Sequence, residues 1–261
     1  MENNEICISS VCATALQALG VAVPEGIAAP NTELTALVQN SDRVILYNPD
    51  AVAWWLYEKY PDVFKAAANC SDKALRLRSV MPSVTPVCFA TMYTGLMPEQ
   101  HGIQKYEKPV LKVDTIFDYL LRAGKKVAIV STAGDSISKI FLERGMDYFI
   151  YPSVRRVNRM AEKLIAEDKY DVLVIYNGDY DTNMHAFGPE RRIPMRHLAQ
   201  NIKTYEHLVE LIRKTYKDKK VFYGFCPDHG CHPIDGRRGS HGLDMPEDMN
   251  IIHFYGVHGG K

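Results

Sequence analysis

The feature of the sequence that most constrains the fold is a series of short apolar runs separated by amphipathic stretches. The runs are RVILY, VAIVS, DYFIY, DVLVIY, KVFYGF and NIIHFYG, at residues 43–47, 127–131, 147–151, 171–176, 220–225 and 250–256. They are almost continuously apolar, as is typical of strands covered on both faces. Stretches between them have helical periodicity, and one ends at Gly124, a residue type favoured at helix C-termini. The pattern predicts an α/β fold: a doubly wound, mostly parallel central sheet with helices on both faces.

The chain is expected to form a single domain over residues 1–261. With 261 residues it can bury a large core without disulfides or structural metals. Residues 1–40 differ from the rest, because they contain one helical stretch, at 9–19, and a connection rich in Pro, Gly and Ala. We interpret this part as an N-terminal helical flanking element rather than a second domain.

Composition argues against several classes of partner. The 31 basic and 31 acidic residues give zero net charge, so a nucleic-acid polymer or an anionic membrane is not an expected partner. No apolar run reaches 18 residues, and MENNEICISS lacks the basic and apolar regions of a signal peptide. The six cysteines are therefore expected to be free thiols in a reducing environment, which predicts a cytoplasmic protein.

Acidic residues and a histidine follow three of the predicted strands. Asp50 follows the first strand, Asp179 and Asp181 follow DVLVIY, and Asp228 and His229 follow KVFYGF. In open α/β sheets, ligands bind beyond the carboxyl ends of the strands. These side chains are therefore expected to converge.

The segment DYDTNMHAFGP contains Asp181 and His185 four positions apart. One helical turn or a tight loop can direct both at one cation, and a carboxylate with an imidazole suits zinc. The alternative is an Asp cap followed by a surface histidine.

Two further segments contain candidate ligands. CPDHGCHP places Asp228 and His229 together at a strand end, where they bind one metal or merely form a turn. A rival interpretation makes Cys226, Cys231 and His232 a structural zinc site, although the spacing is not the usual C-x₂-C. In RRGSHGLD, His241 lies among glycines and is either a ligand or a mobile-loop histidine.

The segment MPSVTPVCFATMYTG predicts a helix that begins at Thr85, as N-cap with Pro86 at N1, and closes at Gly95. On one interpretation Thr85 only caps this helix. On the other its hydroxyl takes part in a reaction. A hydroxyl at a helix N-terminus faces the positive end of the macrodipole, where a phosphoryl group binds well. A nearby divalent cation would lower the pKa of that hydroxyl and make it a nucleophile.

Taken in order, these segments resemble the alkaline phosphatase superfamily, in particular its nucleotide pyrophosphatase and type I phosphodiesterase branch. The resemblance extends from about residue 43 to 258 and is carried best by MPSVTPVCFATMYTGLMPEQHGI, HAFGP, PDHG and GSHGLD. It implies an alkaline phosphatase-like fold and two divalent metal ions, zinc first and manganese as the alternative. It also implies that Thr85 is the nucleophile and forms a covalent phosphothreonine. One metal would be held by Asp50, Asp228, His229 and Thr85, and the other by Asp181, His185 and His241.

The sequence also departs from this family. Asp50 is followed by Ala51 where the family has glycine, so Asn48 is the fallback ligand. Cys88 stands where nucleotide-cleaving relatives carry a phosphate-binding asparagine, and Lys105 is our candidate for replacing that donor. Both are predicted substrate-binding residues. The chain leaves room for only a small cap insertion, at residues 97–113.

The resemblance implies a metal-dependent hydrolase of phosphoric esters, with phosphodiester or pyrophosphate bonds as first choice. The substrate is then a small phosphorylated molecule, with nucleotides among the candidates. A phosphomutase or phosphonate hydrolase on the same metal core is one alternative, and a non-catalytic nucleotide- or metal-binding member is another. A sulfatase is disfavoured, because Thr85 cannot become the formylglycine that those enzymes need. The oligomeric state is not predicted.

Overall fold

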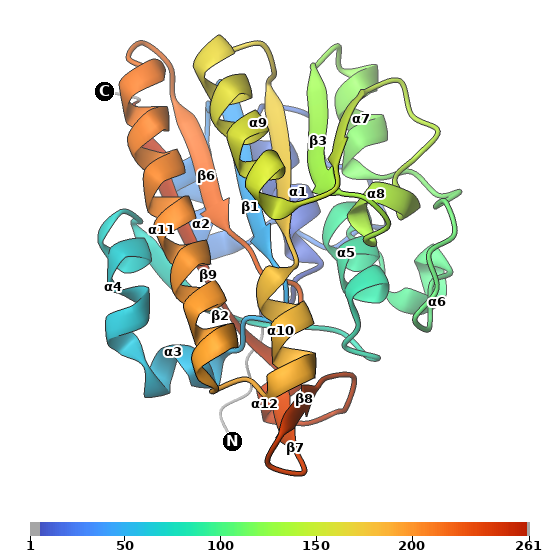
Figure 1. Cartoon of the computed structure of the whole chain (residues 1–261). Coiled ribbons are helices and arrows are strands. Elements are labelled where there is room, and N and C mark those ends of the chain that lie inside the picture. The colour runs from blue at the N-terminus through green and yellow to red at the C-terminus, as the bar shows by residue number, and fades with distance from the viewer. Residues whose placement is uncertain (1–5, 260–261) are drawn as a thin grey trace.

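The computed structural model describes residues 6–259 and contains a seven-stranded sheet between two layers of helices (Figure 1). The strand order is β2-β9-β6-β1-β5-β3-β4. All six predicted strands are present, and the predicted doubly wound α/β fold is confirmed. The strands are β1 (Arg43–Pro49), β2 (Lys73–Arg78), β3 (Val127–Thr132), β4 (Asp147–Tyr151), β5 (Val172–Asn177), β6 (Val221–Phe225) and β9 (Asn250–His258).

The sheet is mostly parallel, as predicted. β1 pairs in parallel with β5 and β6, and β3 pairs in parallel with β4 and β5. Only β9 runs against its neighbours β6 and β2. The apolar pattern did not predict β2, because its sequence KALRLR is half-polar. It lies at the sheet edge, where such a strand is stable with one face exposed.

Each face of the sheet has its own hydrophobic core. One contains residues of α1 (Ser10–Ala18), α2 (Thr32–Val38), α5 (Thr85–Thr94), α7 (Ile116–Arg122) and α8 (Ile137–Ile140). The other contains residues of α3 (Trp54–Lys59), α4 (Pro61–Asn69), α9 (Val154–Glu167), α10 (Asp179–Phe187) and α11 (Arg192–Thr215). Successive residues of β1 alternate between the cores, with Val44 and Leu46 in the first and Ile45 and Tyr47 in the second. This explains why the strands are apolar along their whole length.

The N-terminal element contributes to the core rather than lying beside it. The predicted first helix is α1, and its residues Val11, Cys12 and Leu16 belong to the same core as β1 and α5. A second helix, α2, was not predicted from the sequence. Asn31 caps α2 by accepting a hydrogen bond from the Glu33 N–H (3.0 Å), and the cap is itself buried.

The strand order brings three functional loops together. β6, β1 and β5 are adjacent and parallel, so the segments that follow their carboxyl ends begin side by side. A hairpin of β7 (His232–Ile234) and β8 (Arg238–Ser240), with the short helix α12 (Pro246–Met249), covers this end of the sheet (Figure 1). The candidate site lies at this end of the sheet, beyond the carboxyl ends of β6, β1 and β5.

Candidate active site

The first cluster of candidate ligands consists of Asp50, Asp228 and His229, each at most 1% exposed. Asp50 directly follows β1, and the other two follow β6. The His229 Nε2 atom lies 3.3 Å from Asp50 Oδ1 and 3.4 Å from Asp228 Oδ2. The predicted convergence of these strand ends is therefore present in the structure.

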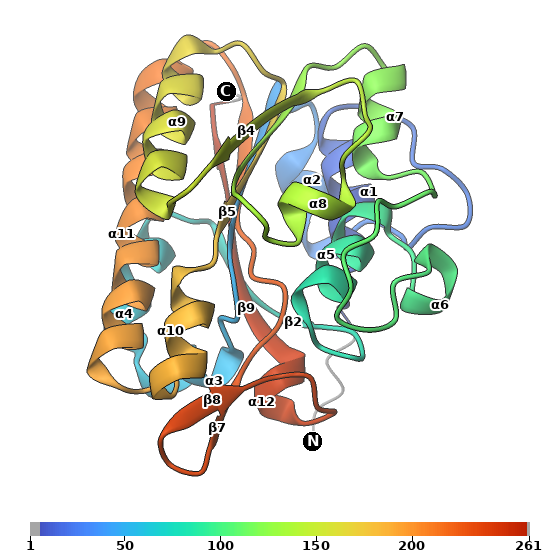
Figure 2. The ribbon, with the colours of Figure 1, turned by 45° about the vertical axis from the view of Figure 1, so that its right-hand side comes forward.

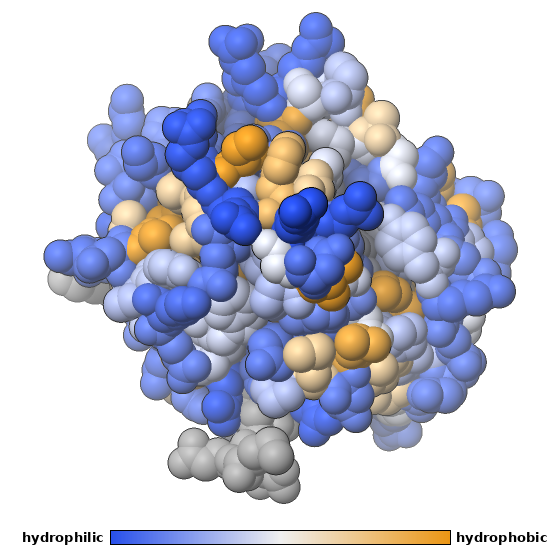
Figure 3. Space-filling model, turned by 60° about the horizontal axis from the view of Figure 1, so that its bottom comes forward, coloured by the Kyte–Doolittle hydropathy of each residue, from blue (hydrophilic) through white to orange (hydrophobic). Residues whose placement is uncertain are grey.

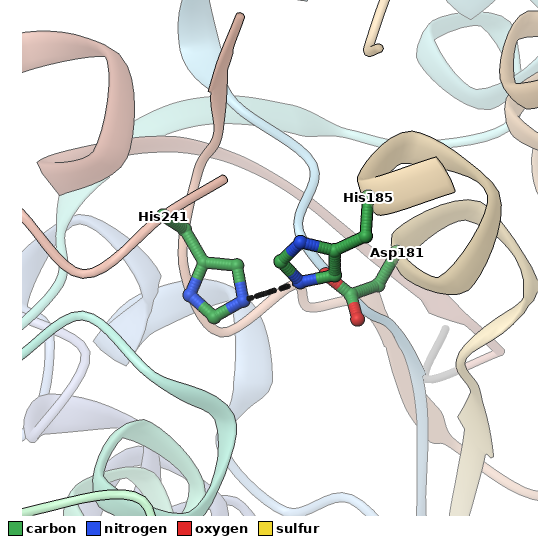
Figure 4. Close-up of side chains that lie close together, drawn as sticks. All are labelled: Asp181, His185 and His241. Carbon is green, nitrogen blue, oxygen red and sulfur yellow. Dashed lines mark hydrogen bonds and ion pairs between the residues drawn. The ribbon is translucent and has the colours of Figure 1, made fainter. Parts of the chain in front are cut away.

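The second cluster consists of Asp181, His185 and His241 (Figure 4). Asp181 and His185 lie one turn apart on α10, and His241 reaches them from the loop after β8. Asp181 Oδ1 lies 3.3 Å from His185 Nε2 and 3.6 Å from His241 Nε2. The predicted turn that aims Asp181 and His185 at one point is thus a helix.

Thr85 lies beside the first cluster. Its Oγ1 is 3.4 Å from Asp50 Oδ2 and 3.3 Å from His229 Nε2. The prediction that Thr85 caps α5 is wrong: Val84 occupies the cap position, and no side chain caps the helix. The hydroxyl contacts the cluster instead, and α5 ends at Gly95 in the left-handed conformation (φ 73°), as predicted.

The histidine rings are held by backbone carbonyls. The Nδ1 atoms of His185, His229 and His241 lie 3.0, 2.9 and 2.8 Å from the carbonyl oxygens of Gly239, Gly230 and Ser83. A carbonyl only accepts hydrogen bonds, so each Nδ1 carries a proton and each neutral ring has its lone pair on Nε2. Metal-binding histidines typically donate a hydrogen bond from the ring nitrogen that does not face the metal.

The two clusters adjoin, because the rings of His229 and His241 stack with centroids 3.9 Å apart. In the second cluster, Nε2 of His185 and Nε2 of His241 are 3.0 Å apart. Two lone pairs at that distance repel unless a cation or a proton lies between them. The Asp181 hydrogen bond raises the pKa of His185, while burial lowers the pKa of His241.

Burial opposes ionisation of the carboxyl groups in the two clusters. Burial, together with the charges of Asp228 and Asp181, raises the pKa of Asp50 well above its usual value. Burial also raises the pKa of Asp228, to about 8. Burial opposes ionisation of Asp181 as well, but the His185 hydrogen bond and the charge of His241 keep its pKa below the usual value.

The donor set fits divalent cations. Two carboxylate oxygens, Asp50 Oδ1 and Asp228 Oδ2, are buried and form no hydrogen bond with any of the described residues. Each lies next to imidazole nitrogens that present lone pairs. Oxygen and nitrogen donors in groups of three suit zinc, and bound cations would compensate the buried negative charge.

Asp248 holds together the two loops that carry His229 and His241. Its carboxylate is fully buried, lies 2.8 Å from His232 Nδ1 and accepts a hydrogen bond from the Leu243 N–H (2.9 Å). Its backbone carbonyl accepts a hydrogen bond from the Gly230 N–H (2.7 Å). Only glycine fits at position 230, because a Cβ there would lie 2.0 Å from the Glu247 carbonyl oxygen.

Two alternatives from the sequence are not supported by the geometry. Asn48 faces away from the clusters, since its side chain hydrogen-bonds the carbonyls of Leu46 and Ile175 and accepts from Tyr93. Asp50 is therefore the residue of this strand that joins the site. The rival zinc trio is not assembled either: Cys226, Cys231 and His232 are not among the ligand groups that converge within the described residues.

A cavity of about 570 Å³ opens beside Thr85, Asp50 and Asp181. Neither predicted substrate-binding residue lines it. Cys88 is fully buried, with its thiol against the Ser79 hydroxyl (3.2 Å), and burial raises the pKa of that thiol. Lys105 points into solvent and pairs with Glu107 (3.4 Å). The wall instead contains Tyr106, Lys108, Arg155 and Tyr176.

Tyr176 is a site residue that the sequence reasoning missed. Its hydroxyl donates a short hydrogen bond to Asp50 Oδ2. It is the last residue of the run DVLVIY, so its position at a strand carboxyl end was the available clue. Lys108 and Tyr106 belong to the 97–113 segment in which Lys105 was chosen. In this segment the residues after α6 (Pro98–His101) form no helix or strand. Sequence periodicity therefore could not indicate which of its side chains face the cavity.

Comparisons with known proteins agree with this geometry. The model of the type I phosphodiesterase/nucleotide pyrophosphatase family matches residues 44–118, which include Asp50 and Thr85. The predicted resemblance to this family is confirmed. A search of curated protein sequences finds no significant match.

Solved structures share the fold. Human ectonucleotide pyrophosphatase/phosphodiesterase 5 superposes with a TM-score of 0.57 at 18% identity, over 73% of this chain and 57% of that one. An inactive form of the murine protein in complex with AMP gives 0.56 at 15% identity, with the same coverage. Phosphonoacetate hydrolase from Sinorhizobium meliloti 1021, in complex with phosphonoformate, gives 0.55 at 17% identity, over 75% of this chain and 58% of that one. The chain thus spans less than two thirds of the length of these proteins.

Proposed function

We propose that this protein is a metal-dependent hydrolase of phosphoric esters, acting first on phosphodiester or pyrophosphate bonds through a covalent intermediate on Thr85. The observation that carries the proposal is the position of the Thr85 hydroxyl. It lies 3.4 Å from Asp50 and 3.3 Å from His229, at the uncapped start of α5. The family match over residues 44–118 supports the same reaction class.

Two divalent cations are the proposed cofactors, zinc first and manganese as the alternative. Asp50, Asp228 and His229 would hold one beside Thr85, and Asp181, His185 and His241 would hold the other. When bound, such ions stabilise negative charge on the attacking and leaving oxygens of an in-line displacement.

The residues of the chain have separate tasks in this proposal. Thr85 Oγ1 attacks phosphorus as the bond from phosphorus to the leaving group breaks, and the hydroxyl proton passes to the neighbouring Asp50 carboxylate. The free N-terminus of α5 stabilises the negative charge of the transferred group. Water then cleaves the phosphothreonine bond and regenerates the hydroxyl.

The cavity beside Thr85 is the proposed site for a small phosphorylated substrate. Nucleotides are among the candidates, since the murine structure named above holds AMP. A cytoplasmic location stays a prediction. No helix among the described residues is both long and apolar enough to span a bilayer.

Phosphonate hydrolysis is the second candidate function, favoured by the structural likeness to phosphonoacetate hydrolase. A phosphomutase would give an isomerised phosphate ester, and a non-catalytic binding protein would give no product. Product analysis with aryl phosphodiesters, aryl monoesters, nucleotides and phosphonoacetate separates these four outcomes.

The decisive variant is Thr85→Ala, assayed after loading with zinc or manganese. We expect wild type to hold close to two metal equivalents, and the variant to lose turnover by about a thousandfold or more. Thr85→Ser is the matched control and should retain part of the activity. Loaded wild type that is inert on every substrate, or Thr85→Ala that turns over normally, would refute the proposal.

A further inference from the structure

The cavity beside Thr85 has two chemically different parts. Asp50, Asp181 and Thr85 belong to the cluster side. The opposite wall comes from the 97–113 segment, the loop after β3 and the turn from β4 into α9. Figure 2 shows that helix α9 begins near α10. This second wall contains two cationic side chains, Lys108 and Arg155.

Neither cation has a carboxylate partner among the described residues. The Lys108 ammonium donates to the Gly134 carbonyl (2.9 Å) and lies 5.2 Å from the ring centre of Tyr106. These contacts hold Lys108 at the wall but do not neutralise it. The Arg155 side chain is exposed and forms no hydrogen bond or ion pair with any described residue. It lies in the first turn of α9, where the macrodipole disfavours a cation and favours a nearby anion.

The acidic side chains on this side of the cavity already have partners. Both oxygens of Asp135 accept hydrogen bonds, from the Ser131 hydroxyl (2.9 and 2.8 Å), the Thr132 hydroxyl (2.7 Å) and the Ser138 N–H (2.8 Å). Asp179 lies 3.7 Å from His197 Nδ1. The neutral donors around Asp135 do not cancel its charge, but neither Asp135 nor Asp179 pairs with Lys108 or Arg155, so both cations can bind an anion in the cavity.

We infer that Lys108 and Arg155 form an anion subsite, and that the substrate carries a second phosphate or carboxylate group besides the phosphoryl group that Thr85 attacks. This inference rests on the proposed function, because it assumes that the first phosphoryl group lies at the metal clusters. Tyr106, an exposed residue beside Lys108, supplies an aromatic face on this wall, so a flat spacer between the two anionic groups fits there.

The test measures binding rather than turnover. Phenylphosphonate, 4-carboxyphenylphosphonate and 1,4-phenylenebisphosphonate are titrated by calorimetry into the metal-loaded protein. They are rigid and share the phosphonate that would bind at the clusters, but only the last two carry a second anion. Arg155→Gln and Lys108→Met are the test variants. Arg156→Gln is the matched control, because Arg156 is exposed in the same helical turn and does not line the cavity.

We expect wild type and Arg156→Gln to bind at least one of the two compounds that carry a second anionic group about tenfold more tightly than phenylphosphonate. In Arg155→Gln and Lys108→Met this preference should fall to within about twofold, while phenylphosphonate binding is unchanged. The preferred compound identifies the second anion as carboxylate or phosphate.

Equal binding of all three compounds by wild type would overturn the subsite and leave the proposed function standing. A preference that survives in both test variants would do the same. Failure of the metal-loaded protein to bind any of the three would overturn both proposals.

Discussion

At the scale of single residues, the site depends on which nitrogen of each histidine faces the cluster. The carbonyls of Gly239, Gly230 and Ser83 fix this by accepting hydrogen bonds from Nδ1. The sequence could predict the histidines themselves, because they stand in short Gly- and Asp-containing segments. It could not predict the carbonyls, since any residue type supplies one.

The predicted ligands and the predicted substrate contacts differ for a physical reason. Five of the seven cluster residues lie in the segments after β1, β5 and β6, and adjacent parallel strands bring these ends together whatever the loops do. The structure accordingly brings all seven predicted cluster residues together. The prediction for Cys88 rests on the position of an asparagine in related proteins, and the prediction for Lys105 rests only on its place in a loop. The side-chain directions there depend on local packing, and Cys88 points into the core.

His101 gives a pH-dependent contribution to stability. It is buried, its Nδ1 accepts a hydrogen bond from the Ile103 N–H (3.2 Å), and Nε2 therefore donates to the Thr91 hydroxyl (3.0 Å). Burial lowers its pKa from 6.5 to about 4. Below pH 6.5 the unfolded chain binds a proton that the folded chain excludes, so stability falls until the pH reaches about 4.

We predict that His101→Asn flattens this dependence. Urea unfolding of the metal-free proteins from about pH 7 to pH 4.5 should show a smaller loss of stability in the variant. At neutral pH the variant should itself be less stable, by about 1–2 kcal/mol, because it lacks one buried hydrogen bond. Identical pH dependence in the two proteins would show that His101 does not contribute.

At the scale of elements, the loops of the site are held by the short helix α12. Apolar periodicity did not indicate this helix, because it has four residues and only Met249 among its apolar side chains is buried. For the same reason the β7–β8 hairpin was not predicted, since each of its strands has three residues. Long, fully apolar strands were predictable, whereas these short connecting elements depend on tertiary contacts.

Asp248→Ala should release these loops. The substitution removes the carboxylate that bonds the His232 ring and the Leu243 N–H, and it leaves the buried His232 ring without this partner. We predict that the free energy of unfolding falls by about 2–4 kcal/mol, measured in urea. Glu247→Ala is the control, because the side chain of this neighbouring residue forms no hydrogen bond within residues 6–259, and it should change stability by less than about 0.5 kcal/mol. Equal effects of the two substitutions would contradict this role for Asp248.

At the scale of the whole molecule, zero net charge conceals a local imbalance. Asp50, Asp181 and Asp228 converge at one end of the sheet, where their ionised carboxylates would repel phosphate unless cations offset the charge. The face toward the bottom of Figure 1 shows small, separate apolar groups in a largely hydrophilic surface (Figure 3), which favours a small substrate over a large apolar partner there.

Metal removal should therefore destabilise the protein as a whole. Binding of cations requires that Asp50 and Asp228 release the protons that their raised pKa values retain. We predict a stabilisation of about 4 kcal/mol at a metal concentration a thousand times the Kd, together with proton release on binding. Calorimetric melting with zinc or a chelator measures the first effect. Titration in buffers of different ionisation enthalpy measures the second. Unchanged melting and no proton release would argue against metal binding at these clusters.

Trapping the covalent intermediate tests directly whether Thr85 attacks phosphorus. Metal-loaded protein is mixed with an aryl phosphodiester, quenched in acid within the first turnovers, digested and analysed by mass spectrometry. We predict a phosphate-ester adduct on Thr85 in wild type and none in Thr85→Ala. Rapid release of the aryl product with no adduct on Thr85, or with the adduct on another side chain, would contradict it.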